Sequence, residues 1–362
     1  MKKNQNNNIS IIFTKLLFFL SLGSNGFIRR WIRLIREYDK VNNKLFFDEE
    51  YYLANNPDVE ASGMPSLKHY HLFGRFEGRK PNENERHMCY PAGHFYSPVV
   101  NIEEIKEREQ EIWDEKSVME LPGIELNINY QFQLINEFSK FYKEIPFQEK
   151  KVNSYRYYFQ NPAFSFSDGI ILYSFIRHFC PSKIIEVGSG FSSALILDTI
   201  DQLKRTDVDV TFIEPYADLL FSLLSDKDKG KVLIIEKNLQ QINLSFFKKL
   251  KKDDILFIDS SHVVKTRSDV NYLILNILPS LNKGVIIHFH DIFYPFEYPQ
   301  NWVFEGRSWN EVYFIRSFLM FNNNFEIMLF PDFIHKNHKE YFSKMPYCFK
   351  NSGGSIWIRK VI

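Results

Sequence analysis

The chain has 362 residues, enough for a full α/β core and a smaller accessory module, since single domains commonly run to about 100–200 residues. Its 45 Lys and Arg residues nearly equal its 44 Asp and Glu residues, which excludes a globally basic protein that binds nucleic acid through its net charge. The three cysteines are far apart, and no pair has metal-ligand spacing. We therefore expect a reduced, cytoplasmic protein.

Residues 1–45 are predicted to form a polar tail followed by a basic amphipathic helix. The apolar run at 11–22 is shorter than the about 20 apolar residues that span a membrane. Residues 27–38 place arginines away from one apolar helical face, which carries Ile28, Trp31, Ile32 and Ile35. Such a helix either docks at the inner face of an anionic membrane or on a partner protein, or packs on its own domain.

Residues 46–82 are predicted to form a small helical accessory module. Asn56-Pro57 should end a first short helix, and Pro65 suits the first turn of a second. The start YYLANNPDV and the end FGRFEGRKP resemble a small module that accompanies bacterial glycan-assembly proteins, including glycosyltransferases. The resemblance implies that the chain works near glycan assembly, where a partner could engage 27–38.

Residues 83–150 are predicted to be a linker and an N-terminal cap, and residues 151–362 the main domain. From Asp168 onward, apolar runs with strand character alternate with helical segments. The expected strands are Ile184–Val187, Val210–Ile213, Val232–Ile235, Ile255–Ile258 and Val285–Phe289. This alternation predicts an α/β fold, a doubly wound, mostly parallel Rossmann-like sheet with helices on both faces.

A buried strand runs into a glycine turn with the sequence EVGSG at 186–190. Gly188 and Gly190 would let the backbone approach a ligand at the carboxyl end of the strand. A NAD-binding loop would require a third glycine where Ser193 stands. The pattern E-x-G-x-G resembles the first motif of class I methyltransferases. That resemblance implies that Glu186 supports the loop and the methionine end of S-adenosylmethionine (SAM), beside Gly188, Ser189 and Gly190.

Three further residues complete the predicted cofactor set. Glu214 ends the second strand, where a carboxylate can accept both ribose hydroxyls of either SAM or NAD. Gln240 follows the third strand, where this fold usually contacts adenine, and Asp259 follows the fourth. These positions predict a nucleoside ligand without deciding the chemistry.

Two consecutive predicted strands deliver polar residues to their carboxyl ends. Asp259 and His262 follow one strand, and His290 and Asp291 end the next. Methyl transfer from a sulfonium is an in-line displacement, so an enzyme must align an acceptor oxygen and help to remove its proton. Mg²⁺ or Mn²⁺ held by Asp259, His290 and Asp291 could assist, or a general base such as His262 or His290. A purely structural cluster is the third alternative.

Residues from about 168 to 358 resemble bacterial class I SAM-dependent methyltransferases of the methyltransferase domain 24 group. The matching stretches are IIEVGSGFSS, DDILFIDSSH, SDVNYLILNILPSL, GVIIHFHDIFYPFEYP, WNEVYFIRSFL and GGSIWI. The resemblance implies a seven-stranded sheet. The group is similar to macrocin-type sugar O-methyltransferases, whose carboxylates at the two equivalent strand ends bind a metal, and this implies a metal here by analogy. His290 stands where that pattern has an acidic residue.

Aromatic and histidine side chains outside the sheet are the candidate acceptor contacts. The segment 292–307 is rich in Pro and aromatics and is expected to form a lid that grips the acceptor through Tyr294, Tyr298 and Trp302. His94 and Tyr96 precede the core in a segment that resembles one found in the same group. They contact substrate or simply anchor a loop.

These patterns together favour a SAM-dependent O-methyltransferase acting on a sugar or another glycan-related hydroxyl. The alternatives are a nicotinamide-dependent oxidoreductase on a related fold and a non-catalytic scaffold in polysaccharide assembly. The expected ligands are SAM, a small-molecule or glycan acceptor, and Mg²⁺ or Mn²⁺ if a metal assists. No nucleic-acid partner is expected.

Overall fold

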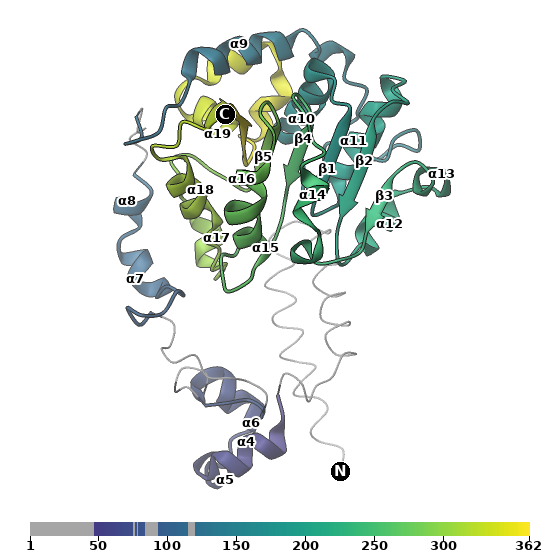
Figure 1. Cartoon of the computed structure of the whole chain (residues 1–362). Helices are drawn as coiled ribbons and strands as arrows, with labels where there is room; N and C mark the ends of the chain where they lie inside the picture. The colour runs from purple at the N-terminus through teal and green to yellow at the C-terminus, as the bar shows by residue number, and fades with distance from the viewer. Residues whose placement is uncertain (1–46, 75–76, 78, 84–92, 115–119) are drawn as a thin grey trace. The chain divides into compact units, whose positions relative to one another are not determined.

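The computed structural model describes residues 47–74, 77, 79–83, 93–114 and 120–362. The chain divides into two units, Met1–Asn101 and Ile102–Ile362 (Figure 1). The predicted basic helix at 27–38 lies outside the described residues. Within the part of the chain that the structure describes, no helix is both long and apolar enough to cross a membrane.

The first unit is a small helical module. Its elements are α4 (Glu49–Asn55), α5 (Pro57–Ser62), α6 (Ser66–His69) and the π-helical turn η1 (Tyr70–Gly74). Asp48 caps α4 by accepting a hydrogen bond from the amide of Tyr51 at 3.1 Å. Asn56-Pro57 ends α4 as expected, but Pro57 also begins α5, so the module has one more short helix than the sequence predicts. Its small core centres on Tyr52, Val59 and Tyr70.

The second unit is built on one seven-stranded sheet. Its strands are β1 (Lys183–Val187), β2 (Asp209–Ile213), β3 (Leu233–Ile235), β4 (Ile255–Ile258), β5 (Ile286–His290), β6 (Phe325–Leu329) and β7 (Ser355–Lys360). They lie in the order β3-β2-β1-β4-β5-β7-β6. The first five pair in parallel, whereas β7 is antiparallel to both β5 and β6. The order reverses between β1 and β4, and open α/β sheets bind ligands at such a point.

Helices flank the sheet (Figure 1). The helices of the second unit within the described residues are α7 (Ile102–Glu107), α8 (Glu109–Ile112), α9 (Ile128–Ser139), α10 (Phe166–Phe179), α11 (Phe191–Gln202), α12 (Asp218–Leu223), α13 (Asp226–Lys229), α14 (Leu244–Phe247), α15 (Asp269–Tyr272), α16 (Leu278–Ser280), α17 (Gln300–Phe304), α18 (Glu311–Leu319) and α19 (Pro331–Asn337). Short 3-10 or π turns join them: η2 (Tyr142–Glu144), η3 (Leu239–Gln241), η4 (Leu273–Ile277), η5 (Lys339–Lys344) and η6 (Pro346–Lys350). The predicted α/β fold class, a doubly wound and mostly parallel Rossmann-like sheet, is confirmed by this arrangement.

The second unit begins at Ile102, well before the predicted domain start at 151. In α9, the side chain of Gln131 donates to the carbonyl of Leu126 at 2.6 Å and accepts from the amide of Phe330 at 2.8 Å. Farther upstream, the indole of Trp113 donates to the carbonyl of Tyr298 at 2.8 Å, next to α17. The segment after Ile102 therefore packs on the sheet domain.

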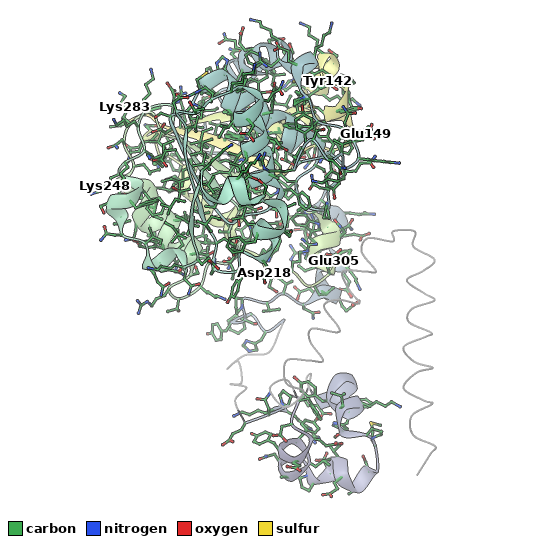
Figure 2. The ribbon with its side chains drawn as sticks, turned by 90° about the vertical axis from the view of Figure 1, so that its right-hand side faces the viewer. Tyr142, Glu149, Asp218, Lys248, Lys283 and Glu305 are labelled. Carbon is green, nitrogen blue, oxygen red and sulfur yellow. The ribbon has the colours of Figure 1, made fainter. Side chains whose placement is uncertain are left out.

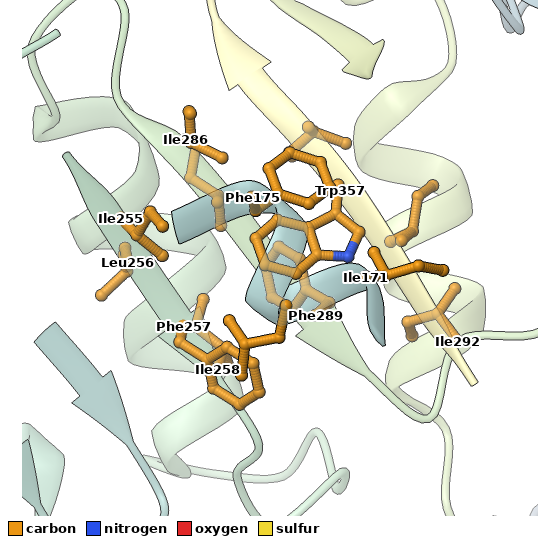
Figure 3. Packing of buried hydrophobic residues seen from close by; sticks show 14 of the residues in the cluster. Ile171, Phe175, Ile255, Leu256, Phe257, Ile258, Ile286, Phe289, Ile292 and Trp357 are labelled. Carbon is orange, nitrogen blue, oxygen red and sulfur yellow. The ribbon is translucent and has the colours of Figure 1, made fainter. Parts of the chain in front are cut away.

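The core is formed by strands whose side chains are apolar on both faces of the sheet. Parallel strands need this pattern because helices cover both faces. Near its centre, Phe175 of α10 stacks face to face on Trp357 of β7, with ring centroids 3.7 Å apart (Figure 3). His288 of β5 lies between Phe257 and Trp357, with centroids 3.9 and 4.5 Å away. Burial holds the pKa of His288 well below its ordinary value, so this histidine is a neutral core residue.

A half-buried cation ties the segment before α10 to α11 and α13. The guanidinium of Arg156 donates to Asp198 at 2.5 Å, to Asp201 at 2.9 Å and to Asp228 at 2.5 and 3.0 Å. Burial opposes ionisation of Asp228, but hydrogen bonds from Arg156 and Ser225 outweigh it and lower the pKa of Asp228 to about 2. Asp228 therefore stays charged in the folded protein at pH values where an unfolded chain would protonate it.

This pKa predicts a specific loss of stability in acid. Because the folded pKa lies below the unfolded value of 3.8, the contribution of Asp228 is present above about pH 4 and is lost as the pH falls toward 2. In urea unfolding, we expect Asp228→Asn to cost about 2 kcal/mol near pH 6 and much less near pH 2.5. Asp201→Asn, at the half-exposed partner, should change little at either pH. An equal cost for Asp228→Asn at both pH values would contradict the assignment.

Candidate functional site

The glycine loop after β1 is held against two neighbouring strands. The amide of Gly188 donates to the carbonyl of Ile213 at 3.0 Å, and the amide of Asp259 donates to the carbonyl of Val187 at 2.8 Å. Gly188 has φ of 81°, and a Cβ placed there would lie 1.8 Å from the carbonyl oxygen of Asp259. Only glycine satisfies both the left-handed backbone and this close approach. At Gly190 a Cβ would meet only a side-chain atom of Leu219, at 3.3 Å.

Glu186 lies under the loop and is fully buried. Its carboxylate accepts hydrogen bonds from the hydroxyls of Ser192 at 2.5 Å and Ser193 at 2.6 Å, the first residues of α11. The Ser193 hydroxyl also accepts from the amide of Gly190 at 3.0 Å. Burial raises the pKa of Glu186 to about 8. The side chain thus braces the turn from below, and its predicted contribution to binding SAM stays a prediction.

A cavity of about 490 Å³ opens at the carboxyl ends of β1, β2 and β4. Four of the predicted cofactor residues line it together: Gly188, Glu214, Gln240 and Asp259. Its volume falls within the about 300–1,000 Å³ that small-molecule sites occupy. Tyr216, Lys265, Arg267 and Asp269 also line it, and the sequence analysis did not select them. Glu186, Ser189 and Gly190 are not among the lining residues.

Glu214 is oriented by the backbone around it. One carboxylate oxygen accepts from the amide of Ser189 at 3.2 Å, and the other from the amide of Tyr216 at 2.8 Å. Each oxygen keeps acceptor capacity for a further donor, because a carboxylate has about four lone-pair sites. Across the cavity, the Gln240 amide donates to the carbonyl of Arg267 at 2.8 Å.

A second cluster adjoins the cavity where β4 and β5 end. Nε2 of His262 lies 3.3 Å from Asp259 and 3.4 Å from Asp291. These three residues present ligand atoms within 4.8 Å of one another. On the other side of the ring, Nδ1 of His262 donates to Glu311 at 2.9 Å. The parallel pairing of β4 with β5 brings the two aspartates together, as the sequence predicts.

The start of α18 positions His262. The amides of Asn310 and Glu311 both donate to the carbonyl of His262 at 3.1 Å. The amide of Val264 donates in turn to the Asn310 side chain at 2.6 Å. His262 itself has φ of 59°, a left-handed conformation that these bonds hold in place. The loop after β4 and the helix after the predicted lid therefore form one hydrogen-bonded unit.

The pKa values of the residues in this cluster depart from their ordinary values. Burial opposes the charge on His262, but hydrogen bonds to Asp259 and Glu311 outweigh it and hold its pKa well above the ordinary value. Burial raises the pKa values of Glu311 and Asp291. For Asp259, the charges on His290 and His262 outweigh burial and lower its pKa. Three carboxyl groups thus surround the imidazole of His262 and favour its charged form.

His290 lies beside this cluster but outside the group of three. Its Nε2 is 3.5 Å from Asp291, and its Nδ1 contacts no hydrogen-bond partner among the described residues. Asp168 is buried nearby at the start of α10, and its charge acts on His290. The predicted metal ligands are Asp259, His290 and Asp291. The residues whose ligand atoms lie close together are Asp259, His262 and Asp291, so His262 takes the place of His290. Asp168 stands in no recognisable motif, so no local pattern predicts its place beside His290.

Two of the three predicted acceptor contacts on the lid are core residues. Tyr294 is 1% exposed, with its ring packed 5.0 Å from that of Phe333. Tyr298 is 3% exposed, and its hydroxyl accepts from the amide of Val312 at 3.3 Å. The expectation of direct acceptor contact is therefore corrected for both, because their rings are buried against residues that follow the lid segment: Phe330 and Phe333 for Tyr294, and Trp309 and Tyr313 for Tyr298. Trp302 is half-buried and remains a candidate.

His94 and Tyr96 belong to the first unit. The amide of Tyr96 donates to Nδ1 of His94 at 3.1 Å, and the intervening Phe95 stacks on the imidazole with centroids 5.0 Å apart. These contacts fit the loop-anchor alternative. Substrate contact by either residue stays a prediction.

The stretch that contains the glycine loop matches known proteins. A family model described as a methyltransferase domain matches residues 185–292, the stretch from β1 to just past β5. A protein of Archaeoglobus fulgidus, described only as uncharacterized, is 30% identical over 181 residues, which cover 48% of this chain and 79% of that protein. This chain belongs to the methyltransferase domain family. The prediction of a SAM-dependent methyltransferase is confirmed at that level, while the sugar acceptor and the metal stay predictions.

Solved structures similar to the methyltransferase include two with bound cofactor or product. The S-adenosylhomocysteine-bound methyltransferase PaMTH1 of Podospora anserina is 15% identical, with a TM-score of 0.35 over 72% of this chain and 97% of that one. The O-methyltransferase TomG of Streptomyces achromogenes, involved in tomaymycin synthesis and solved with SAM, is 12% identical, with a TM-score of 0.35 over 64% and 90%.

The close approach of Gly188 to Asp259 predicts a severe effect of one methyl group. We expect Gly188→Ala to lower the free energy of unfolding by about 2 kcal/mol or more beyond the cost of its left-handed backbone, because Cβ would overlap the Asp259 carbonyl. Gly306→Ala is the matched control, since Gly306 has φ of 83° with open space around its Cβ position. Similar unfolding midpoints in denaturant for the two variants would contradict the prediction.

Proposed function

We propose that the methyltransferase uses SAM to methylate a hydroxyl oxygen of a sugar or glycan-related acceptor. The observation that carries the proposal is the position of His262, whose Nε2 faces Asp259 and Asp291 beside the cofactor cavity. Asp259 belongs to both features: it lines the cavity and is part of the cluster. The point where cavity and cluster meet is therefore the place for the reacting methyl group and the acceptor oxygen.

The cavity supports SAM as the ligand through Glu214 and the glycine loop. The Glu214 carboxylate, oriented by two backbone amides, retains acceptor sites for two ribose hydroxyls. Gly188 and Gly190 leave the loop surface without side chains, so a ligand can approach its backbone. The methionine end would then extend toward Asp259, whose negative charge suits a sulfonium.

The donor set fits a divalent cation. Asp259, His262 and Asp291 would hold it, and such an ion would make the acceptor hydroxyl more acidic. Glu311 completes the arrangement, because a ligating histidine usually donates its other ring N–H to a carboxylate. Carboxylates suit Mg²⁺ and Mn²⁺, and the imidazole moves the preference toward Mn²⁺.

The raised pKa of His262 argues against a simple histidine base. An imidazole whose pKa is held well above its ordinary value carries its proton at neutral pH and cannot accept another. The same surroundings favour a cation at this point, whether the charge belongs to the imidazolium or to a bound ion. Asp291 lies within reach to receive the acceptor proton.

The sugar half of the proposal draws on aromatic rings near the cluster. The indole of Trp309 packs on the His262 ring with centroids 4.4 Å apart, and Trp302 lies 5.5 Å from Trp309. Indole faces pack well against the C–H faces of sugars. The resemblance of the first unit to modules of glycan-assembly proteins points in the same direction.

Incubation with labelled SAM and a cell-surface glycan extract tests the proposal. We expect a product heavier by one methyl group and stable to the mild base that cleaves methyl esters, because the methyl group is on a hydroxyl oxygen. In the same assay, the variant Asp291→Asn should slow methyl transfer by about 100-fold or more relative to the wild-type protein. Binding of SAM in isothermal titration without any transfer would instead support a scaffold, and binding of NAD alone would support an oxidoreductase.

Removal of divalent ions should slow the reaction. We expect chelation to lower the rate of methyl transfer at least about tenfold, and added Mn²⁺ to restore it, because the acceptor hydroxyl is a very weak acid without a cation beside it. An unchanged rate in a preparation verified as metal-free by elemental analysis would rule the metal out.

The Glu311–His262 contact gives a prediction that does not depend on turnover. Glu311→Gln removes the carboxylate that orients the imidazole, so we expect Mn²⁺ affinity in isothermal titration to fall about 10–100-fold. Glu297→Gln is the control, because Glu297 also accepts a side-chain hydrogen bond, from Tyr313 at 2.6 Å, but away from the cluster. Equal Mn²⁺ affinities for the two variants would refute the role of Glu311.

A further inference from the structure

The guanidinium of Arg307 lies against two indole rings beside the cluster of Asp259, His262 and Asp291. Its Cζ is 4.3 Å from the ring centroid of Trp302 and 5.1 Å from that of Trp309. Trp309 in turn packs on His262, with ring centroids 4.4 Å apart. One indole therefore contacts both the imidazole of the cluster and the cation of Arg307.

The hydrogen bonds of Arg307 leave part of its donor capacity unused. Its Nε and Nη2 donate to one oxygen of Glu305 at 3.0 and 2.9 Å, while Nη1 has no hydrogen bond to another described residue. Glu305 lies on the outside of the second unit, where its side chain is 53% exposed (Figure 2). An ion pair this exposed contributes little, so a ligand can replace or join Glu305 at small cost.

A comparison within the chain separates this arginine from a purely structural one. The side chain of Arg156 is only 17% exposed, and its donors are shared among three aspartates on two helices, α11 and α13. Arg307 pairs only with a residue two positions away and is 35% exposed. Its indole neighbours hold the guanidinium in place ahead of binding, which reduces the conformational entropy that a ligand must remove.

We infer that Arg307 binds an anionic group of the acceptor, a carboxylate or a phosphate, while Trp302 and Trp309 pack against its sugar ring. The inference rests on the proposed function and names its substrate class: an acidic sugar. The planar guanidinium fork matches both anions. Arg307 and His262 both contact the Trp309 indole, and a single sugar ring can carry a hydroxyl and an acidic substituent.

The test divides a cell-surface glycan extract by anion exchange into acidic and neutral fractions and supplies labelled SAM to each. We expect the wild-type protein to label the acidic fraction, and Arg307→Gln to reduce that label at least about tenfold. Arg307→Lys, which keeps the charge but loses the fork, should fall between them. Arg205→Gln is the control, because Arg205 also pairs with an acid two residues away, Asp207, at an exposed site.

Competing sugars identify the anionic group that Arg307 binds. Inhibition by methyl glucuronide would indicate a carboxylate and inhibition by glucose 1-phosphate a phosphate, and either supports the inference if neutral methyl glucoside inhibits much less. Label confined to the neutral fraction and unchanged by Arg307→Gln would overturn the inference while leaving sugar methylation intact. Absence of label from both fractions, with SAM binding verified by titration, would instead overturn the proposed function and the inference with it.

Discussion

The contact between the backbone of Gly188 and the carbonyl of Asp259 is the constraint on which the rest of the site depends. It sets the spacing between the loop after β1 and the end of β4, and so it places the cavity and the cluster around His262 on either side of one residue, Asp259. Glu186 reinforces the same point from below by bonding the first serines of α11. A bulkier loop residue would separate strands that must end side by side.

The parts of this methyltransferase that follow from local patterns could be predicted from its sequence. The glycine loop, the acid after β2 and the aspartates after β4 and β5 all belong to strand ends, and the parallel order of strands brings strand ends together. Runs of apolar residues located the first five strands to within about a residue, because strands buried on both faces are continuously apolar.

The features that the sequence could not reveal depend on contacts between distant segments. His262 lies beside the two aspartates because Glu311, 49 positions later, orients its ring through a hydrogen bond. No local sequence pattern around either residue predicts that bond. Tyr294 and Tyr298 lie in an aromatic-rich segment that was expected to contact the acceptor, yet their rings are buried against α19 and α18, which come later in the chain. An aromatic residue gives the same signal whether it packs a loop or binds a ligand.

The position of β7 bears on how the protein comes to be folded. This strand follows β6 in the chain but lies between β5 and β6 in the sheet, antiparallel to both. During synthesis, β5 and β6 emerge from the ribosome before β7 does. The edges of β5 and β6 that pair with β7 therefore stay unpaired until residues 355–360 arrive. Until then Phe175 and His288 lack the indole that covers them. The nascent domain therefore has exposed strand edges and an open core, the state in which chaperones bind and neighbouring chains aggregate.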